Sequence, residues 1–260
     1  MHLMKKMTGL LIAAALLAAV LPAAGSAGED IHVVILATSD IHGNLWGYSY
    51  ENDTETENSG MARLYTYISQ VRAENPTVFL VDGGDELQGT IITDQIANRE
   101  PEKEHPVMTA MNDMGYDAMT LGNHEFDWGV ETLKTILSQA DFPVLGANVL
   151  DRDGGYLTGS GWTILERNGI RLAVIGVCTP DVPVWDHDRE GVADTTFEAA
   201  APAVKKAIAE IGDRADIILV SAHMGQYAEY DMDGKSDEGE TIAAGTRKWI
   251  SGSWRPCISR

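Results

Sequence analysis

The 260-residue chain has few cysteines, few basic residues and no long apolar segment. Its two cysteines, Cys178 and Cys257, are too few for a disulfide framework, and the apolar run before Cys178 predicts a buried structural thiol there. The longest apolar stretch, residues 8–21, is shorter than the ~20 residues that cross a bilayer. We therefore expect neither a disulfide-rich scaffold nor stable membrane insertion.

Basic residues are much rarer than acidic ones, because 19 Lys and Arg face 39 Asp and Glu, and the formal net charge is −20. This charge disfavours sequence-independent binding to a nucleic-acid polymer. It also repels anionic substrates, so any phosphate chemistry would need a local positive charge, most simply a metal ion.

Residues 1–27 have the pattern of a secretory signal, in which lysines precede an apolar stretch that ends in small residues at 25–27. We therefore expect cleavage near Gly28 and an exported protein, located in a periplasm, a cell wall or the medium. An uncleaved N-terminal anchor is the alternative. The length and composition of the rest predict one globular domain, or at most two small ones.

Short apolar runs alternate with helical patterns along the rest of the chain, which is typical of an α/β protein with a largely buried sheet. Asn168-Gly169, between residues 162–166 and 170–177, predicts a β-hairpin, so the sheet should be mixed rather than purely parallel. The clearest other predicted strands are residues 31–37, 77–81, 116–121, 143–147 and 216–221. Two predicted helical faces contain Met61, Leu64, Tyr65, Ile68 and Val71, and Phe197, Ala201, Val204, Ile208 and Ile211. Two polar segments, residues 51–60 and 229–241, are predicted to be exposed loops.

Polar side chains gather directly after four of the predicted strands, at the carboxyl ends where open α/β sheets usually place their sites. Taken alone, these groups have ordinary structural explanations, such as a tight turn around Asp85 or a hydrogen-bonded core position for His223. Together they would bring several oxygen and nitrogen ligands to neighbouring strand ends. Asp, Asn and His side chains suit a transition ion such as Mn, Zn, Fe or Co better than Ca. The groups are Asp40 and His42; Asp85; Asn123, His124, Glu125 and Asp127; and His223.

These residues lie in motifs that resemble those of a known family, the exported 5′-nucleotidases and 2′,3′-cyclic-nucleotide 2′-phosphodiesterases (3′-nucleotidases) of the calcineurin-like metallophosphoesterases. The resemblance implies an α/β fold of four layers, α-β-β-α, with mixed sheets. It also implies a hydrolase of nucleotide catabolism, acting on 2′,3′-cyclic nucleotides and on 3′- or 5′-nucleotides. The motifs are Ser-Asp-Ile-His-Gly-Asn at 39–44, Gly-Gly-Asp-Glu-Leu-Gln-Gly at 83–89, Leu-Gly-Asn-His-Glu-Phe-Asp at 121–127, Gly-Ala-Asn-Val at 146–149 and Ser-Ala-His-Met-Gly at 221–225.

The resemblance also implies a role for each matched residue. Asp40 and His42 would bind one divalent cation, and Asp85 would bridge two cations. Asn123 with His223 would bind the second cation. Two such ions, of Mn, Zn, Fe or Co, promote in-line displacement at phosphorus.

The catalytic pair implied by the resemblance is His124 with Asp127. His124 would stabilise charge on the phosphoryl group or assist the leaving oxygen, while Asp127 would fix the tautomer and orientation of its ring. Nucleotides are then the expected substrates, and the oligomeric state stays open.

The match departs from the family where a Gly-His-x-His motif should close the site, because no histidine follows His223. The resemblance therefore implies an incomplete metallophosphoesterase domain over residues 28–245. The tail at 246–260 is unusually basic, and a frameshift would explain it. The alternative function is that of an inactive truncated remnant, or of a metal- or nucleotide-binding module without the last metal ligands.

Overall fold

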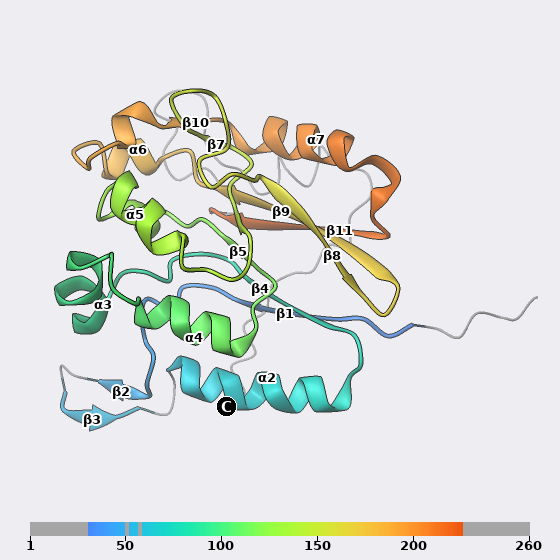
Figure 1. Cartoon of the computed structure of the whole chain (residues 1–260), viewed down its shortest axis with the longest axis horizontal. Coiled ribbons are helices and arrows are strands. Elements are labelled where there is room, and N and C mark those ends of the chain that lie inside the picture. Colours follow the sequence, from blue (N-terminus) through green and yellow to red (C-terminus); the bar gives the residue numbers. More distant parts are fainter. Residues whose placement is uncertain (1–30, 50–51, 57–58, 226–260) are drawn as a thin grey trace, which may run out of the picture. The chain divides into compact units, whose positions relative to one another are not determined.

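The computed structural model describes residues 31–49, 52–56 and 59–225 (Figure 1). The chain divides into two units, residues 1–32 and 33–260, and every described helix and strand belongs to the second. The predicted signal at 1–27, the predicted loop at 229–241 and the tail at 246–260 lie outside the described residues. None of the described helices has the length and apolar character needed to span a bilayer.

The first sheet is purely parallel. Its strands lie in the order β1 (Val34–Thr38), β4 (Val78–Asp82), β5 (Ala118–Thr120) and β6 (Val144–Leu145). All five residues of β4 are buried, as expected for an apolar strand in the middle of a covered sheet. Parallel pairing places the carboxyl ends of these strands at one edge, which is where the polar motifs begin.

The second sheet contains the predicted hairpin. Strands β8 (Trp162–Arg167) and β9 (Ile170–Cys178) are antiparallel, and β11 (Ile217–His223) is parallel to β9. Asn168 and Gly169 have φ values of 50° and 76°, the left-handed conformation that a two-residue hairpin turn requires. The prediction of a mixed sheet is therefore confirmed here.

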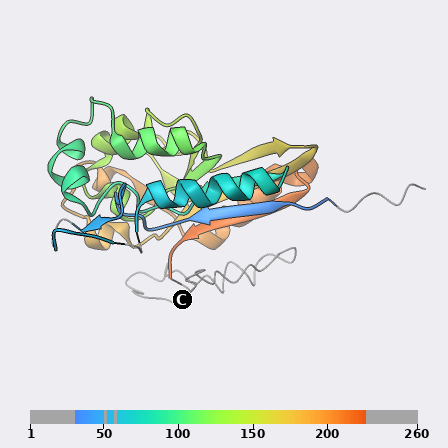
Figure 2. The same cartoon turned by 90° about the horizontal axis from the view of Figure 1, so that it is seen from below.

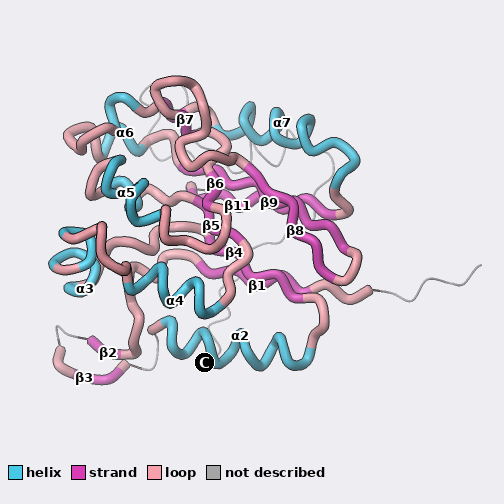
Figure 3. Tube along the Cα trace, in the orientation of Figure 1, coloured by secondary structure: helices cyan, strands magenta, loops and turns pink. Residues whose placement is uncertain are grey.

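Helices cover the outer face of each sheet (Figure 3). The alternating burial of side chains along the strands shows how the layers pack. On β9, Leu172 and Val174 pack between the sheets, whereas Ala173 and Ile175 pack against the helix α7 (Ala200–Ile211). Leu80 of β4 points away from the second sheet and packs in the core between the first sheet and its covering helices. The predicted four-layer α-β-β-α architecture is confirmed.

Helices α2 (Met61–Glu74), α4 (Pro106–Met114) and α5 (Val130–Leu137) build that core on the first sheet (Figures 1 and 2). Helix α2 begins after Gly60 and ends at Glu74, and Met61 and Ile68 form its buried stripe. Tyr65 was expected in this stripe but is 50% exposed. It lies at the margin of the stripe, where helical spacing alone does not decide burial.

The remaining elements are short. They are the helices α3 (Ile91–Gln95) and α6 (Val182–Trp185), the 3₁₀ turns Ala97–Arg99, His124–Phe126, Val192–Asp194 and Gly212–Arg214, and the antiparallel pairs β2 (Tyr48–Ser49) with β3 (Thr54–Glu55) and β7 (Val149–Leu150) with β10 (Thr196–Phe197). Two expectations need correction here. Strand β3 lies within the predicted loop 51–60, and Phe197 belongs to β10 rather than to α7. Two-residue strands carry too few side chains for a period of two to show in the sequence.

Candidate metal centre

The loops after β1 and β4 continue the pairing of these strands beyond their ends. The Gly83 N–H donates to the Thr38 carbonyl at 2.8 Å, and the Asp40 N–H donates to the Gly84 carbonyl at 2.9 Å. The His42 N–H then donates to the Asp85 carbonyl at 3.0 Å. These hydrogen bonds fix the two polar motifs side by side.

The backbone at three predicted ligands is left-handed. Asp40, His42 and Asp85 have φ values of 56°, 52° and 64°. Asp and His tolerate this region better than most residues, but the conformation is uncommon outside glycine. It persists because the hydrogen bonds between the loops over-determine it, as is often found at functional sites.

Two glycines allow the motif loops to approach closely. A Cβ atom on Gly84 would lie 2.4 Å from the Gly122 nitrogen. A Cβ atom on Gly122 would lie 2.2 Å from Oδ1 of Asp85 and 2.8 Å from Oε2 of Glu125. A side chain at Gly122 would therefore displace the carboxylate expected to bridge two cations.

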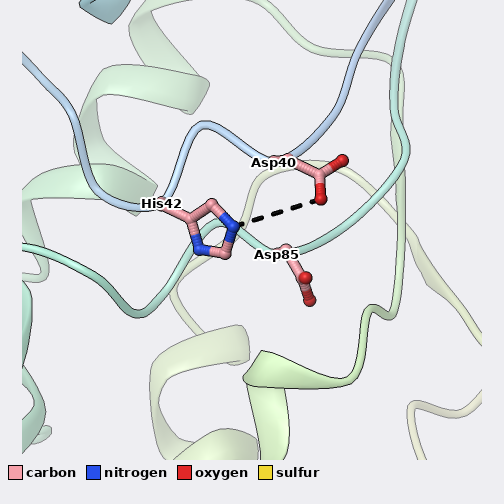
Figure 4. A group of neighbouring side chains, drawn as sticks. All are labelled: Asp40, His42 and Asp85. Carbon is pink, nitrogen blue, oxygen red and sulfur yellow. Dashed lines mark ion pairs between the residues drawn. The ribbon is translucent and has the colours of Figure 1, made fainter.

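Asp40, His42 and Asp85 form a cluster whose ligand atoms all lie within 4.8 Å of one another (Figure 4). Nε2 of His42 is 4.0 Å from Oδ1 of Asp40. Asp85 is buried, whereas Asp40 is exposed, so the cluster opens to solvent on one side. Two carboxylates and an imidazole are a donor set that fits a divalent transition ion.

His223, at the end of β11, brings the second sheet to this cluster. Its Nε2 lies 3.1 Å from Oδ2 of Asp85 and 3.2 Å from Oδ1 of Asn123. Its Nδ1 lies 2.8 Å from the Gly83 carbonyl, which can only accept, so Nδ1 carries a proton and Nε2 faces Asp85 and Asn123. The structure thus places Asp85 between two groups of donors, as a bridging carboxylate would be.

Asp85 and His223 form a largely buried ion pair. Burial alone would lower the pKa of His223, but the hydrogen bond and charge of Asp85 outweigh it and raise this pKa to about 9. Burial likewise acts to raise the pKa of Asp85, but the hydrogen bond and charge of His223 prevail and lower it. A cation that binds Nε2 therefore competes with a proton.

Two more acids lie beneath the cluster. Burial raises the pKa of Asp82 to about 7, although the Thr38 hydroxyl and the Gly84 N–H donate to its carboxylate. Burial and the neighbouring Asp82 raise the pKa of Glu86 well above its usual value. These acids therefore contribute less negative charge than their number suggests.

His124 and Asp127 are in contact next to the cluster. Nδ1 of His124 lies 3.0 Å from Oδ2 of Asp127. The hydrogen bond that His124 donates to Asp127 raises the pKa of His124 to about 9 against the effect of burial, and the charge of Asp85 adds to the shift. The ring centroid of His124 is 5.4 Å from that of His42, and its side chain is 37% exposed. A cationic imidazole thus borders the site and is accessible to a ligand.

Glu125 was given no role by the sequence, although it stands inside the third motif. It is 2% exposed, and its carboxylate accepts hydrogen bonds from backbone N–H groups of the loops after β4 and β5. The sequence did contain one signal for such a role, because Glu125 is an acid in the third motif that the predicted site does not use. A sequence does not show, however, whether an acid points at a cation or at the backbone.

A cavity of about 360 Å³ lies beside the cluster. Asp40 and Asn44 line it from the first motif, and Arg63 and Leu64 line it from α2. Arg63 makes no ion pair within residues 31–49, 52–56 and 59–225. This cavity therefore places a cationic side chain near the cluster in an otherwise acidic protein.

Comparison with known proteins gives matches to one family model and to several relatives. The family model described as bacterial capsule synthesis protein PGA_cap matches residues 93–243, more than half of the chain. The trifunctional nucleotide phosphoesterase protein YfkN of Bacillus subtilis is 35% identical over 218 residues, which are 77% of this chain and 15% of that protein. The 2′,3′-cyclic-nucleotide 2′-phosphodiesterase/3′-nucleotidase of Salmonella typhimurium is 31% identical over 83% of this chain and 35% of its own length. The chain thus spans about a third or less of these two relatives.

A solved structure shares both fold and sequence with this chain. The crystal structure of the calcineurin-like phosphoesterase YfkN from Bacillus subtilis superposes with a TM-score of 0.74 at 31% identity. The match covers 84% of this chain and 69% of that one.

Proposed function

Since the chain belongs to the calcineurin-like phosphoesterases and, by its match over more than half of its length, to the family of the PGA_cap model, we propose that it hydrolyses nucleotide phosphoesters with two divalent cations. Calcineurin-like phosphoesterases use divalent metals, and one candidate metal cluster lies among the described residues. The observation that carries the proposal is the position of Asp85, between the Asp40 and His42 side chains and those of Asn123 and His223.

The chain's own residues have distinct tasks in this proposal. Asp40, His42 and Asp85 would hold one cation, and Asp85, Asn123 and His223 the other. When bound, such cations polarise a phosphoryl group and promote in-line attack by water. Asp85 is fixed for this task by its buried position and by the His124 N–H, which donates to Oδ1 at 2.9 Å.

His124 would hold a proton where charge develops on the phosphoryl or leaving oxygen. Its contact with Asp127 occupies Nδ1 and leaves Nε2 as the donor towards substrate. The hydrogen bond to Asp127 favours the protonated ring, as a hydrogen-bond donor to an anion requires. Asp127 acts through His124, by orienting the ring.

The proposed substrates are 2′,3′-cyclic nucleotides and 3′- or 5′-nucleotides. Support comes from the relatives, whose names include a trifunctional nucleotide phosphoesterase and a 2′,3′-cyclic-nucleotide 2′-phosphodiesterase/3′-nucleotidase. The cavity beside Asp40 offers space for part of the substrate beyond the scissile phosphate, with Arg63 as a cation on its wall.

Phosphate release from 2′,3′-cyclic AMP, 3′-AMP and 5′-AMP by the purified chain tests the proposal. We expect turnover that depends on added Mn²⁺ and that is lost in His42→Ala. His187→Ala, a substitution of an exposed histidine outside the motifs, should keep the activity. Turnover no higher than that of His42→Ala would contradict the proposal and favour the alternative, an inactive remnant or a binding module. Mn²⁺ uptake without turnover would single out the binding module.

Export and domain organisation are part of the same proposal. The lysines, apolar stretch and small residues of 1–27 support export. The proposed organisation of the rest is a phosphoesterase domain over 28–245 and an atypical tail over 246–260. Cell fractionation followed by N-terminal sequencing tests this, and we expect a mature N-terminus near Gly28. Recovery of the intact N-terminus in the cytoplasmic fraction would contradict it.

A further inference from the structure

Glu125 is a buried acid that the proposed reaction does not use. Its carboxylate accepts four backbone hydrogen bonds. Oε2 accepts from the N–H of Asp85 at 2.8 Å and of Gly122 at 2.6 Å. Oε1 accepts from the N–H of Glu86 at 2.8 Å and of Leu87 at 3.3 Å. One side chain therefore joins the loop after β4 to the loop after β5.

These hydrogen bonds act on the residue expected to bridge the cations. Asp85 has a left-handed backbone, with φ 64°, and its N–H points at Glu125 rather than along a strand ladder. Its Oδ1 accepts from the His124 N–H, one residue before Glu125. The backbone of Asp85 is thus held by the Glu125 side chain, and its carboxylate by the neighbouring N–H of the same turn.

A carboxylate is the side chain that this position requires. An ionised carboxylate accepts hydrogen bonds at both oxygens and donates none, so it can serve four converging N–H groups. A glutamine would aim an NH₂ group at some of these donors and leave buried N–H groups unpaired, which is unfavourable. The Gly122 hydrogen atoms leave room for this arrangement, because a Cβ there would lie 2.8 Å from Oε2.

We propose that Glu125 is a positioning residue that sets the affinity of the centre for divalent cations by fixing the backbone of Asp85. The proposal rests on the proposed function, because it takes Asp85 to be a cation ligand. Residues that orient metal ligands typically change metal affinity by 10–100-fold when they are replaced.

A Mn²⁺ titration of Glu125→Gln tests the proposal. The affinity is measured by calorimetry and, independently, from the EPR signal of free Mn²⁺. The matched control is Asp117→Asn. Asp117 also accepts a backbone N–H of β4, from Leu80 at 2.8 Å, but it pairs with Arg167 instead of bordering the cluster. We expect Glu125→Gln to bind Mn²⁺ roughly 10–100-fold more weakly with an unchanged circular dichroism spectrum. Asp117→Asn should lose thermal stability but keep the wild-type affinity.

Glu125→Asp provides a second variant if the glutamine protein does not fold. It keeps an acceptor-only group on a shorter stem, and we expect an affinity between those of the wild type and Glu125→Gln. Wild-type affinity in Glu125→Gln, or in Glu125→Asp where only that variant folds, would overturn the proposal, as would an equal loss in Asp117→Asn. A wild-type chain that binds no Mn²⁺ would instead overturn the proposed function, and this inference with it.

Discussion

Nε2 of His223 lies 3.1 Å from Oδ2 of Asp85, and this contact helps to join the end of β11 in the second sheet to the loop after β4 in the first. The candidate centre is therefore built across both sheets rather than on one motif. Its assembly therefore depends on how the two sheets pack. The layer between the sheets is apolar and contains Leu172 and Val174 of the second sheet and Phe79 and Val81 of the first.

Removal of this histidine should weaken the second cation site. We expect His223→Ala to lower Mn²⁺ affinity and to remove one of two bound ions, because Asp85 and Asn123 would lose the nitrogen donor beside them. Calorimetric titration gives both affinity and stoichiometry. His187→Ala is the control, since its side chain is exposed and outside the motifs. Unchanged stoichiometry and affinity in His223→Ala would remove this residue from the ligand set.

Replacement of His124 should damage the chemical step and spare the cations. We expect His124→Ala to lower kcat by roughly 10²–10⁴ while the metal content, measured by mass spectrometry, stays at the wild-type level. Asp127→Asn should lower kcat less, because the ring stays in place but its hydrogen-bond partner is altered. A His124→Ala protein that loses its metals would show that this residue is a ligand instead.

A methyl group at Gly122 should disrupt the centre from within. In Gly122→Ala the new Cβ would lie 2.2 Å from Oδ1 of Asp85, so the loop must shift. We expect a loss of stability of about 1–3 kcal/mol in urea unfolding, together with weaker Mn²⁺ binding. Gly155→Ala is the matched control, because its Cβ would meet nothing closer than 3.6 Å. Equal behaviour of the two variants would contradict the close approach of the motif loops.

Arg63 should influence substrate binding more than turnover. We expect Arg63→Gln to raise KM for nucleotides roughly tenfold with little change in kcat, since hydrogen bonds to charged groups contribute about 1.5–3 kcal/mol. Steady-state kinetics on 3′-AMP measures both constants. Arg152→Gln is the control, because Arg152 is exposed and pairs with Asp194. A KM that does not change would exclude Arg63 as a contact of the substrate.

His105 should make the protein less stable in acid. It is 1% exposed, its Nε2 lies 3.1 Å from Oδ1 of Asn98, and burial lowers its pKa to about 4. The unfolded chain takes up a proton near pH 6.5, while the folded chain does so only near pH 4. The stability that the neutral ring provides is therefore fully present above about pH 6.5 and is lost as the pH falls towards 4, at roughly 1.4 kcal/mol per pH unit.

Urea unfolding at several pH values between 7.5 and 4 measures this dependence. His105→Gln should show a smaller loss of stability over that range than the wild type. The acids Asp82 and Glu86 titrate with the opposite sign, but they are common to both proteins and cancel in the comparison. Parallel stability curves for wild type and variant would contradict the prediction.

Residue types and their spacing were enough to predict the fold class and the order of the motifs along the chain. Apolar runs marked β4 and β11, Asn168-Gly169 marked the hairpin, and all of these are confirmed with boundaries shifted by one or two residues. The motifs also supplied every side chain of the candidate centre, because a ligand's chemistry is a property of its residue type. Their assignment as cation ligands and as a catalytic pair stays a prediction.

How these side chains meet, and which groups hold them in place, depends on contacts between distant segments. The left-handed backbone at Asp85, the inward turn of Glu125 and the contact between His223 and Asp85 all arise from hydrogen bonds and packing between segments far apart in the chain. Hydrophobic periodicity reports only which face of a single element is buried. It cannot show where a loop directs its carboxylates, because that direction is set by backbone donors and acceptors supplied by other loops.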